Sequence, residues 1–295
     1  MFNSQQKEKF IDYTLNNSIG NNEKLRETDW VNFFNRLEDI EKTIEKDFAE
    51  FDYSEMMNLL PLVLRKKVSY QRQVLSLLRT YLNWCIENEC SKDSENRLIG
   101  ITPDDIDFSK SYSMCMVKDE QQLSEYLDKI FRDIKEDSND NMYRLMCHLI
   151  FNGIERDLLF DLKLNQINLE NQCIHLKNDT LNLSETCCKL IKYNSEMSAI
   201  SYGETRYEDI FKAGYVLENT SKERDKMFYS AASYLSKKFA ELKEILHYPI
   251  AITMNTLYRS GQMYRLYLNE QNNIPLNLDN TLLLEYQAWK KAFQL

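Results

Sequence analysis

Glycine and proline are scarce in this sequence. Its 295 residues include 6 glycines and 4 prolines, whereas these two types make up roughly 12% of an average protein. Both are the usual residues of tight turns, and all-β sandwiches and barrels need a turn every few residues. The shortage therefore excludes collagen-like repeats, disfavours a turn-rich β fold and favours a mainly helical chain.

Long hydrophobic runs are also missing. No uninterrupted apolar stretch approaches the ~20 residues that span a bilayer. The first residues, MFNSQQKE, lack the apolar core of a secretory signal. We therefore expect a cytoplasmic protein with no membrane partner.

Positive charge and metal-ligand spacings are in short supply too. The formal net charge is −9, which disfavours a protein that coats nucleic acid or anionic membrane without selectivity. The 7 cysteines include no Cys-x-x-Cys pair, and the 3 histidines are scattered. Since a structural zinc site needs four such ligands at defined spacings, we expect buried free thiols, no metal and no cofactor.

What the sequence does contain is apolar residues at helical spacing along most of its length. Ser69 can cap a helix over 70–87, and Pro61 suits the first turn of a helix over 60–68. Further helices are predicted over 24–50, 119–135, 141–151, 184–193, 204–212, 222–247, 255–268 and 278–293.

Two segments depart from the helical spacing. The stretch around Gly100 and Pro103 is polar and acidic, so we interpret residues 91–118 as a linker between a helical domain (1–90) and a second domain (119–295). Polar and apolar residues alternate over 167–183, with turn residues at Asn178-Asp179. This alternation predicts a small β-hairpin in the second domain.

A gap in acidic residues separates Glu55 from Glu87, although the segment contains five basic residues. Arg72 and Arg79 are seven residues apart, so on a helix they share one face about 10 Å apart. With Lys67 and Ser69 at the start of that helix, such a face is typical of a phosphate-contacting surface. An ordinary solvated helix face is the alternative. The basic residues of the gap are Arg65, Lys66, Lys67, Arg72 and Arg79.

A second acid-free window runs from Ile245 to Asn269 and contains Arg259 and Arg265 among several tyrosines. Two basic windows, one in each half, suit a clamp around a DNA duplex. The alternative is a buried helix with two exposed basic residues.

The order of these parts resembles the tyrosine recombinase, or phage integrase, family. Residues 68–85 are similar to the last long helices of its core-binding domain. Residues 149–163 and 166–176 resemble its Gly-Leu-Arg-x-x-Glu-Leu-x-x-Leu motif, its Asp-Ile-Asp and its first β-hairpin, with Gly153 and Leu162 matching. The resemblance implies a mainly α, two-domain fold: a helical SAM-like core-binding domain and an integrase-like catalytic-type domain with a small β-sheet.

The chemistry of that family is missing at the matching positions. Glu155 stands at the first catalytic arginine, and Tyr258 at the second. Recombinases need these cations to stabilise the charge that develops on the phosphate, so a carboxylate there opposes catalysis. We therefore expect a fold without strand cleavage, with Tyr286 packed beside Leu283 and Trp289. The degenerate active-site positions are Glu155, Arg156, Lys177, Asn255, Tyr258 and Tyr286.

The sequence most resembles the MrpR/YopR lytic-cycle repressors of SPbeta-type prophages. The resemblance implies a non-catalytic, sequence-specific transcriptional repressor that binds a double-stranded DNA operator and maintains lysogeny at the nucleoid of a bacterial host. The C-terminal helix docks either in its own domain or, by self-association, in a second copy. Candidate DNA-binding residues are Lys66, Lys67, Ser69, Gln71, Arg72, Arg79, Arg259 and Arg265.

Two other hypotheses stay open. The first is an active tyrosine recombinase that uses Tyr286 as nucleophile with Arg156, Lys177 and Arg259. The second is a protein–protein interaction scaffold without DNA binding. The net charge of −9 favours this hypothesis.

Overall fold

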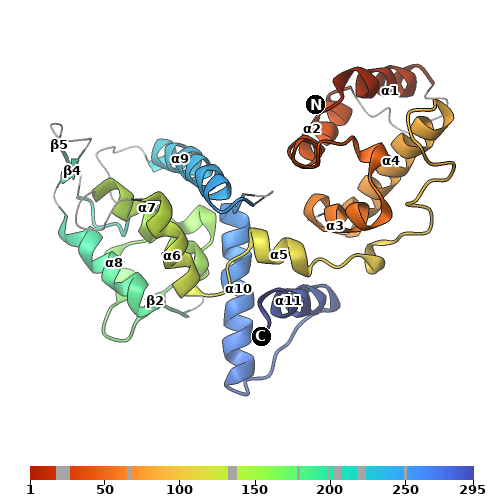
Figure 1. The fold of residues 1–295 in the computed structure, drawn as a ribbon. Coiled ribbons are helices and arrows are strands. Elements are labelled where there is room, and N and C mark those ends of the chain that lie inside the picture. Colours follow the sequence, from red (N-terminus) through yellow and green to blue (C-terminus); the bar gives the residue numbers. More distant parts are fainter. Residues whose placement is uncertain are drawn as a thin grey trace. The chain divides into compact units, whose positions relative to one another are not determined.

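Helices form most of the chain in the computed structural model of the protein (Figure 1). The structure describes residues 1–17, 27–64, 68–131, 138–177, 180–197, 199–201, 207–210, 212–217, 224–248 and 251–295. The chain divides into two compact units, Met1–Ser111 and Tyr112–Leu295. Among the described residues, no helix is both long and apolar enough to cross a membrane.

The N-terminal unit is a helical bundle with an aromatic core. The ring of Phe10 lies 4.8 Å from that of Trp30 and 5.1 Å from that of Tyr81, and Phe34 lies 5.0 Å from Tyr81. These edge-to-face pairs join residues from three helices. The unit consists of α1 (Ser4–Asn17), α2 (Glu27–Ile44), η1 (Phe48–Glu50), α3 (Tyr53–Val63), α4 (Val68–Glu87) and η2 (Pro103–Asp105).

The helix around Pro61 begins earlier than predicted. Asp52 accepts a hydrogen bond from the Glu55 backbone N–H, and the Glu55 side chain accepts one from the Asp52 N–H. This capping box starts α3 at Tyr53, so Pro61 lies in the last turn of the helix and the prediction of a helix over 60–68 is wrong.

Residues 91–111 belong to the N-terminal unit. Leu98 and Ile106 are buried in its core, and Asn96 Nδ2 donates to the Arg79 backbone oxygen at 2.9 Å. The division of the chain therefore differs from the linker that we predicted over 91–118, because two apolar side chains hold this polar segment against α4.

The C-terminal unit is built around α7 (Ser138–Phe151), whose second half is buried on all sides. Gly261 of α10 (Met254–Gln271) lies against the end of α7 so closely that an added Cβ would be 1.7 Å from the Phe151 oxygen. The other helices of this unit are α6 (Glu120–Ile130), η3 (Arg156–Leu158), η4 (Leu164–Gln166), α8 (Glu185–Glu196), α9 (Arg224–Ile245) and α11 (Asn280–Phe293), while α5 (Ser109–Cys115) spans the division between the units.

The predicted hairpin is part of a three-stranded antiparallel sheet, in the order β1 (Ile167–Asn168), β2 (Cys173–His175) and β3 (Thr180–Asn182). Ile167 faces Ile174, and Cys173 faces Asn182. The predicted turn at 178–179 lies outside the described residues. The mainly helical fold class with a small sheet is confirmed.

A second sheet replaces a predicted helix. Over 204–212 we expected helix, but β5 (Tyr207–Asp209) pairs antiparallel with β4 (Ala199–Ser201). Short helices are marginal without a long apolar stripe, whereas strand pairing satisfies the backbone groups directly.

Candidate nucleic-acid interface and the recombinase-motif positions

The exposed side of α4 is a stripe of uncharged polar residues flanked by a cation. Gln73, Ser76, Thr80 and Asn83 are exposed and follow one another at three- and four-residue steps, with exposed Arg72 beside them. The stripe is about 15 Å long at the rise of an α-helix. Its opposite side, which includes Val74, Leu78 and Tyr81, is buried. We call the five exposed residues the α4 face.

Two predicted DNA-binding residues of α4 instead bond within the N-terminal unit. The Arg79 Nε donates to the Leu98 backbone oxygen at 2.9 Å, and its Nη2 donates to the Ile101 oxygen. Gln71 is buried, and its Nε2 donates to the Leu64 oxygen at 3.1 Å. The prediction that Arg79 faces outward with Arg72 is wrong, because loop carbonyls without helical partners attract its guanidinium.

The other candidates at the start of α4 are only partly described. Lys66 and Lys67 lie outside the described residues, and Ser69 is described only as part of the helix backbone. A cation that the sequence did not reveal lies nearby: exposed Arg36 of α2 donates to the Tyr70 hydroxyl and lies 5.9 Å from the centre of its ring. No local spacing links α2 to α4, so only the fold brings Arg36 to this helix.

The second group of candidates lies on the N-terminal half of α10. Thr253 caps this helix by accepting from the Thr256 N–H at 3.1 Å. Asn255 and Arg259 are exposed and Tyr258 is half-buried, and Arg259 forms an ion pair with Glu285 of α11. These residues line a cavity of about 530 Å³, here called the Asn255 cavity, whose lining is Asn255, Tyr258, Arg259, Gln262, Asp279, Leu282 and Glu285.

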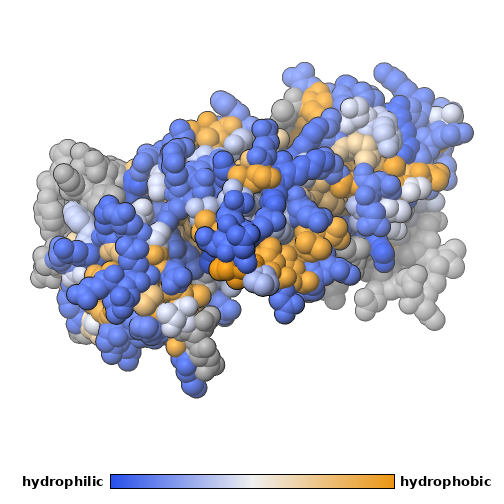
Figure 2. Space-filling view, turned by 90° about the horizontal axis from the view of Figure 1, so that it is seen from below, coloured by the Kyte–Doolittle hydropathy of each residue, from blue (hydrophilic) through white to orange (hydrophobic). Residues whose placement is uncertain are grey.

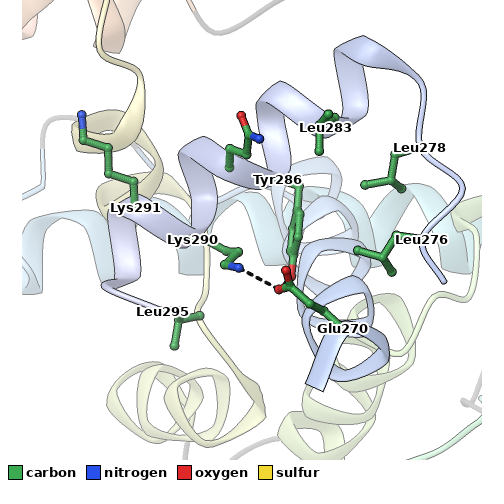
Figure 3. Close-up of a pocket in the computed structure, with 9 residues that line it drawn as sticks. Glu270, Leu276, Leu278, Leu283, Tyr286, Lys290, Lys291 and Leu295 are labelled. Atoms are coloured by element: carbon green, nitrogen blue, oxygen red, sulfur yellow. Dashed lines mark hydrogen bonds and ion pairs between the residues drawn. The ribbon is translucent and has the colours of Figure 1, made fainter. Parts of the chain in front are cut away.

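Tyr286 of α11 lies beside Glu270 of α10 (Figure 3). It is 2% exposed, and its hydroxyl donates to Glu270 Oε2 at 2.7 Å. Burial, and then the Glu270 carboxylate, raise the pKa of this phenol well above its usual value. Its ring stacks 6.2 Å from that of Trp289, which confirms the predicted packing with Trp289. Leu283, in contrast, is 39% exposed and is not a core residue.

Tyr286 lines a second cavity of about 470 Å³, here called the Glu270 cavity. Its lining is Glu270, Leu276, Leu278, Leu283, Tyr286, Gln287, Lys290, Lys291 and Leu295.

The recombinase-motif positions of α10 and α11 are therefore divided between the two cavities. Consecutive residues of α11 contact opposite ends of α10: Glu285 pairs with Arg259, whereas Tyr286 bonds to Glu270. Tyr258 and Glu270 are 12 residues apart on one helix, or about 18 Å at the helical rise. A nucleophile and the groups that stabilise the developing charge must all lie about 3 Å from the same phosphate, and this arrangement keeps Tyr286 away from the Asn255 cavity.

Arg265 is used within the fold. Its Nη1 donates to the Phe151 oxygen at 2.7 Å, and its guanidinium lies over Gly153, whose φ is +102°. Burial lowers the pKa of this arginine. Arg265 thus binds the C-terminal end of α7, and the prediction that it is an outward-facing cation is wrong.

The remaining motif positions are at the surface. Glu155 and Arg156 are exposed at the start of η3, and Lys177 is exposed after β2.

Most of the N-terminal unit is similar to a known core-binding domain. Residues 1–87 match the family model described as MrpR, N-terminal core-binding domain. The resemblance to MrpR is confirmed over this part of the chain. No curated protein matches the sequence.

Several solved structures are similar in outline. The XerA recombinase is 11% identical with a TM-score of 0.39, and 96% of each chain is covered. The integrase from mycobacterium phage Brujita is 8% identical (TM-score 0.36; 96% of this chain and 97% of that chain). The Tn1549 transposon integrase in complex with circular intermediate DNA is 13% identical (TM-score 0.33; 96% and 94%). Because these identities and TM-scores are so low, no function is transferred from them.

Proposed function

We propose that this protein is a transcriptional repressor that binds an operator in double-stranded DNA and keeps a prophage dormant. The observation that carries the proposal is the α4 face, an exposed helix surface free of acidic residues, within a unit whose first 87 residues match the MrpR core-binding domain. In a chain with a net charge of −9, such a surface is where DNA would meet the least repulsion. A bacterial nucleoid is the corresponding location.

The chemistry of the α4 face suits a major groove. The groove admits an α-helix, and the side-chain amides of Gln and Asn can bind adenine edges in a bidentate manner. Gln73 is exposed at the N-terminal end of this surface, next to Arg72, whereas the Asn83 oxygen already accepts from Asn96 at 2.7 Å. Gln73 is therefore the base-reading residue in our proposal, and Arg72 and Arg36 contact phosphates.

We propose further that the C-terminal unit is an integrase-like domain that does not cleave DNA. The order of elements supports this: Gly153 follows α7, and the three-stranded sheet, α10 and α11 come after it in the chain. Glu155 at the first arginine position, and the separation of Tyr286 from the Asn255 cavity, support the absence of cleavage. The C-terminal helix packs on α10 of its own unit, where Trp289 is fully buried, so the proposal needs no second copy.

Removing the cation of the α4 face tests DNA binding. We expect Arg72→Gln to weaken binding to all sequences and to lower the slope of log affinity against log salt by about one, as for the loss of one phosphate contact. Fluorescence anisotropy with fragments of the source genome at several salt concentrations measures this slope.

Lys42→Gln is the matched control, because Lys42 is an exposed cation of the same unit, 60% exposed on α2. Its salt slope should stay at the wild-type value. Equal slopes for wild type and Arg72→Gln would overturn the assignment of α4, and no binding to any fragment would favour the scaffold hypothesis.

A nicked suicide substrate tests the absence of cleavage. We expect no covalent protein–DNA adduct with the wild-type chain, because the Tyr286 phenol is hydrogen-bonded to a carboxylate and has a raised pKa. Denaturing electrophoresis detects such an adduct. An adduct that forms with wild type and disappears in Tyr286→Phe would establish an active recombinase instead.

A further inference from the structure

The three-stranded sheet of the C-terminal unit has one apolar face and one polar face. Side chains alternate between the two faces along each strand. The register places Ile167, Ile174 and Leu181 on one face, where they belong to the core or pack against it. The other strand residues share the opposite face, here called the polar sheet face. They are Asn168, Cys173, His175, Thr180 and Asn182.

The polar sheet face lies at the protein surface. Its residues His175, Thr180 and Asn182 are exposed, and Asn168 is half-buried. Most of the surface that Figure 2 shows is likewise hydrophilic, with smaller apolar areas between. Cys173 is 5% exposed, and the residues directly opposite it on the neighbouring strands are Asn168 and Asn182. Its thiol therefore lies among polar side chains at the surface, where a molecule as small as a peroxide can approach it.

The Cys173 thiol is paired with a histidine. Its Sγ lies 3.7 Å from His175 Nε2, and His175 Nδ1 lies 3.2 Å from the Thr180 hydroxyl oxygen. In the tautomer whose Nδ1 carries the proton, Nδ1 donates to Thr180 and Nε2 presents a lone pair to the thiol. A nucleophile, a base and a group that orients the base form the arrangement by which proteins activate cysteine.

Other thiols of the chain are in different surroundings. Burial raises the pKa of Cys85, Cys147 and Cys187, and since the thiolate is the reactive form of cysteine, these three thiols are inert. Cys90 is the least buried of the seven cysteines, and its sulfur donates to the Asn88 backbone oxygen at 3.4 Å. Exposure alone therefore favours reaction at Cys90, whereas a neighbouring imidazole favours reaction at Cys173.

We propose that Cys173 is a peroxide-reactive thiol that His175 activates. His175 Nε2 takes the thiol proton, and the Cys173 sulfur attacks one oxygen of hydrogen peroxide. An S–O bond forms and the O–O bond breaks, and the departing hydroxide takes the proton from His175 and leaves as water. The sulfur is oxidised by two electrons while the peroxide is reduced. The product is a sulfenic acid, a modification that thiols can reverse.

Peroxide treatment of the full chain in the presence of dimedone, which labels sulfenic acids, tests this site. Peptide mass spectrometry measures the rate at which each cysteine is labelled. We expect Cys173 to be labelled at least about tenfold faster than Cys90, because proton transfer to a positioned base commonly accelerates a reaction by more than this factor. Equal rates, or faster labelling of Cys90, would mean that exposure alone governs reactivity and would overturn the proposal.

Two histidine substitutions test the role of the imidazole. We expect His175→Asn to slow the labelling of Cys173 at least about tenfold and to leave the rate of Cys90 unchanged. His247→Asn is the matched control, because His247 is an exposed histidine of the same unit, and both rates should stay at their wild-type values.

Circular dichroism verifies that both histidine variants are folded. An unchanged rate at Cys173 in folded His175→Asn would contradict the activation of this thiol by His175. If His175→Asn does not fold, the comparison of Cys173 with Cys90 in the wild-type chain still decides the matter, because it needs no variant.

Discussion

Replacing Gly261 with alanine is expected to destabilise the C-terminal unit by about 3 kcal/mol or more, at the upper end of overpacking effects. An added Cβ would be 1.7 Å from the Phe151 oxygen and 2.6 Å from its carbonyl carbon. These are backbone atoms at the buried end of α7, so no side chain can rotate away. The helices α7 and α10 must separate, which also strains the hydrogen bond from Arg265 to the same oxygen. Urea denaturation followed by far-UV circular dichroism measures the loss.

Gly214→Ala is the control for this substitution. Gly214 has a φ of +81° and nothing within 4 Å of an added Cβ, so its replacement has only a backbone cost of about 1–2 kcal/mol. If Gly261→Ala were no more destabilising than Gly214→Ala, the close approach of α7 and α10 would not limit stability.

Replacing Lys7 with methionine is expected to destabilise the N-terminal unit by about 3–5 kcal/mol, as when one partner of a buried ion pair is removed. Lys7 and Glu41 are both 0% exposed and form an ion pair, and Lys7 Nζ lies 3.5 Å from Asp47 Oδ2. Without the ammonium group, two carboxylates stay buried with no cation. Chemical denaturation of both proteins measures the difference.

The pH dependence of this variant gives a second measurement. Burial already raises the pKa of Glu41 in the folded state, and the loss of Lys7 raises it further. When the pKa of a carboxyl group is higher in the folded state than in the unfolded state, the folded state is more stable at low pH, and this stability is lost as the pH rises through the folded-state pKa. The deficit of Lys7→Met should therefore shrink as pH falls from 7 toward 5.

Lys9→Met is the matched control, since Lys9 is an exposed lysine on the same helix. It should unfold like the wild type at both pH values. A deficit in Lys7→Met that is small or independent of pH would contradict a stabilising role for the buried ion pair.

Local structure was largely predictable from the sequence. The helical spacing of Val74, Leu78 and Tyr81 predicted both α4 and its buried side, and therefore that Arg72 is exposed. The alternation over 167–183 predicted strands. The prediction of a helix over 204–212 was wrong because the partner strand of this short segment, rather than its own spacing, decides its conformation.

The roles of the arginines were not predictable in this way. Arg79 binds carbonyls 19 and 22 residues away, and Arg265 binds one 114 residues away. A long guanidinium side chain binds the acceptors that the fold brings near it. Sequence spacing gives its side of the helix but not those acceptors, so two predicted DNA contacts became internal hydrogen bonds.

By itself, the sequence determined the helical class of this protein and the presence of Glu155 and Tyr258 where the resemblance to recombinases leads us to expect arginines, because periodicity and residue identity are properties of the chain. Only the tertiary structure decided that Glu285 and Tyr286 contact opposite ends of α10. The physical reason is that neighbouring residues of a helix point about 100° apart. The packing of α11 on α10 therefore selects which cavity each of them lines.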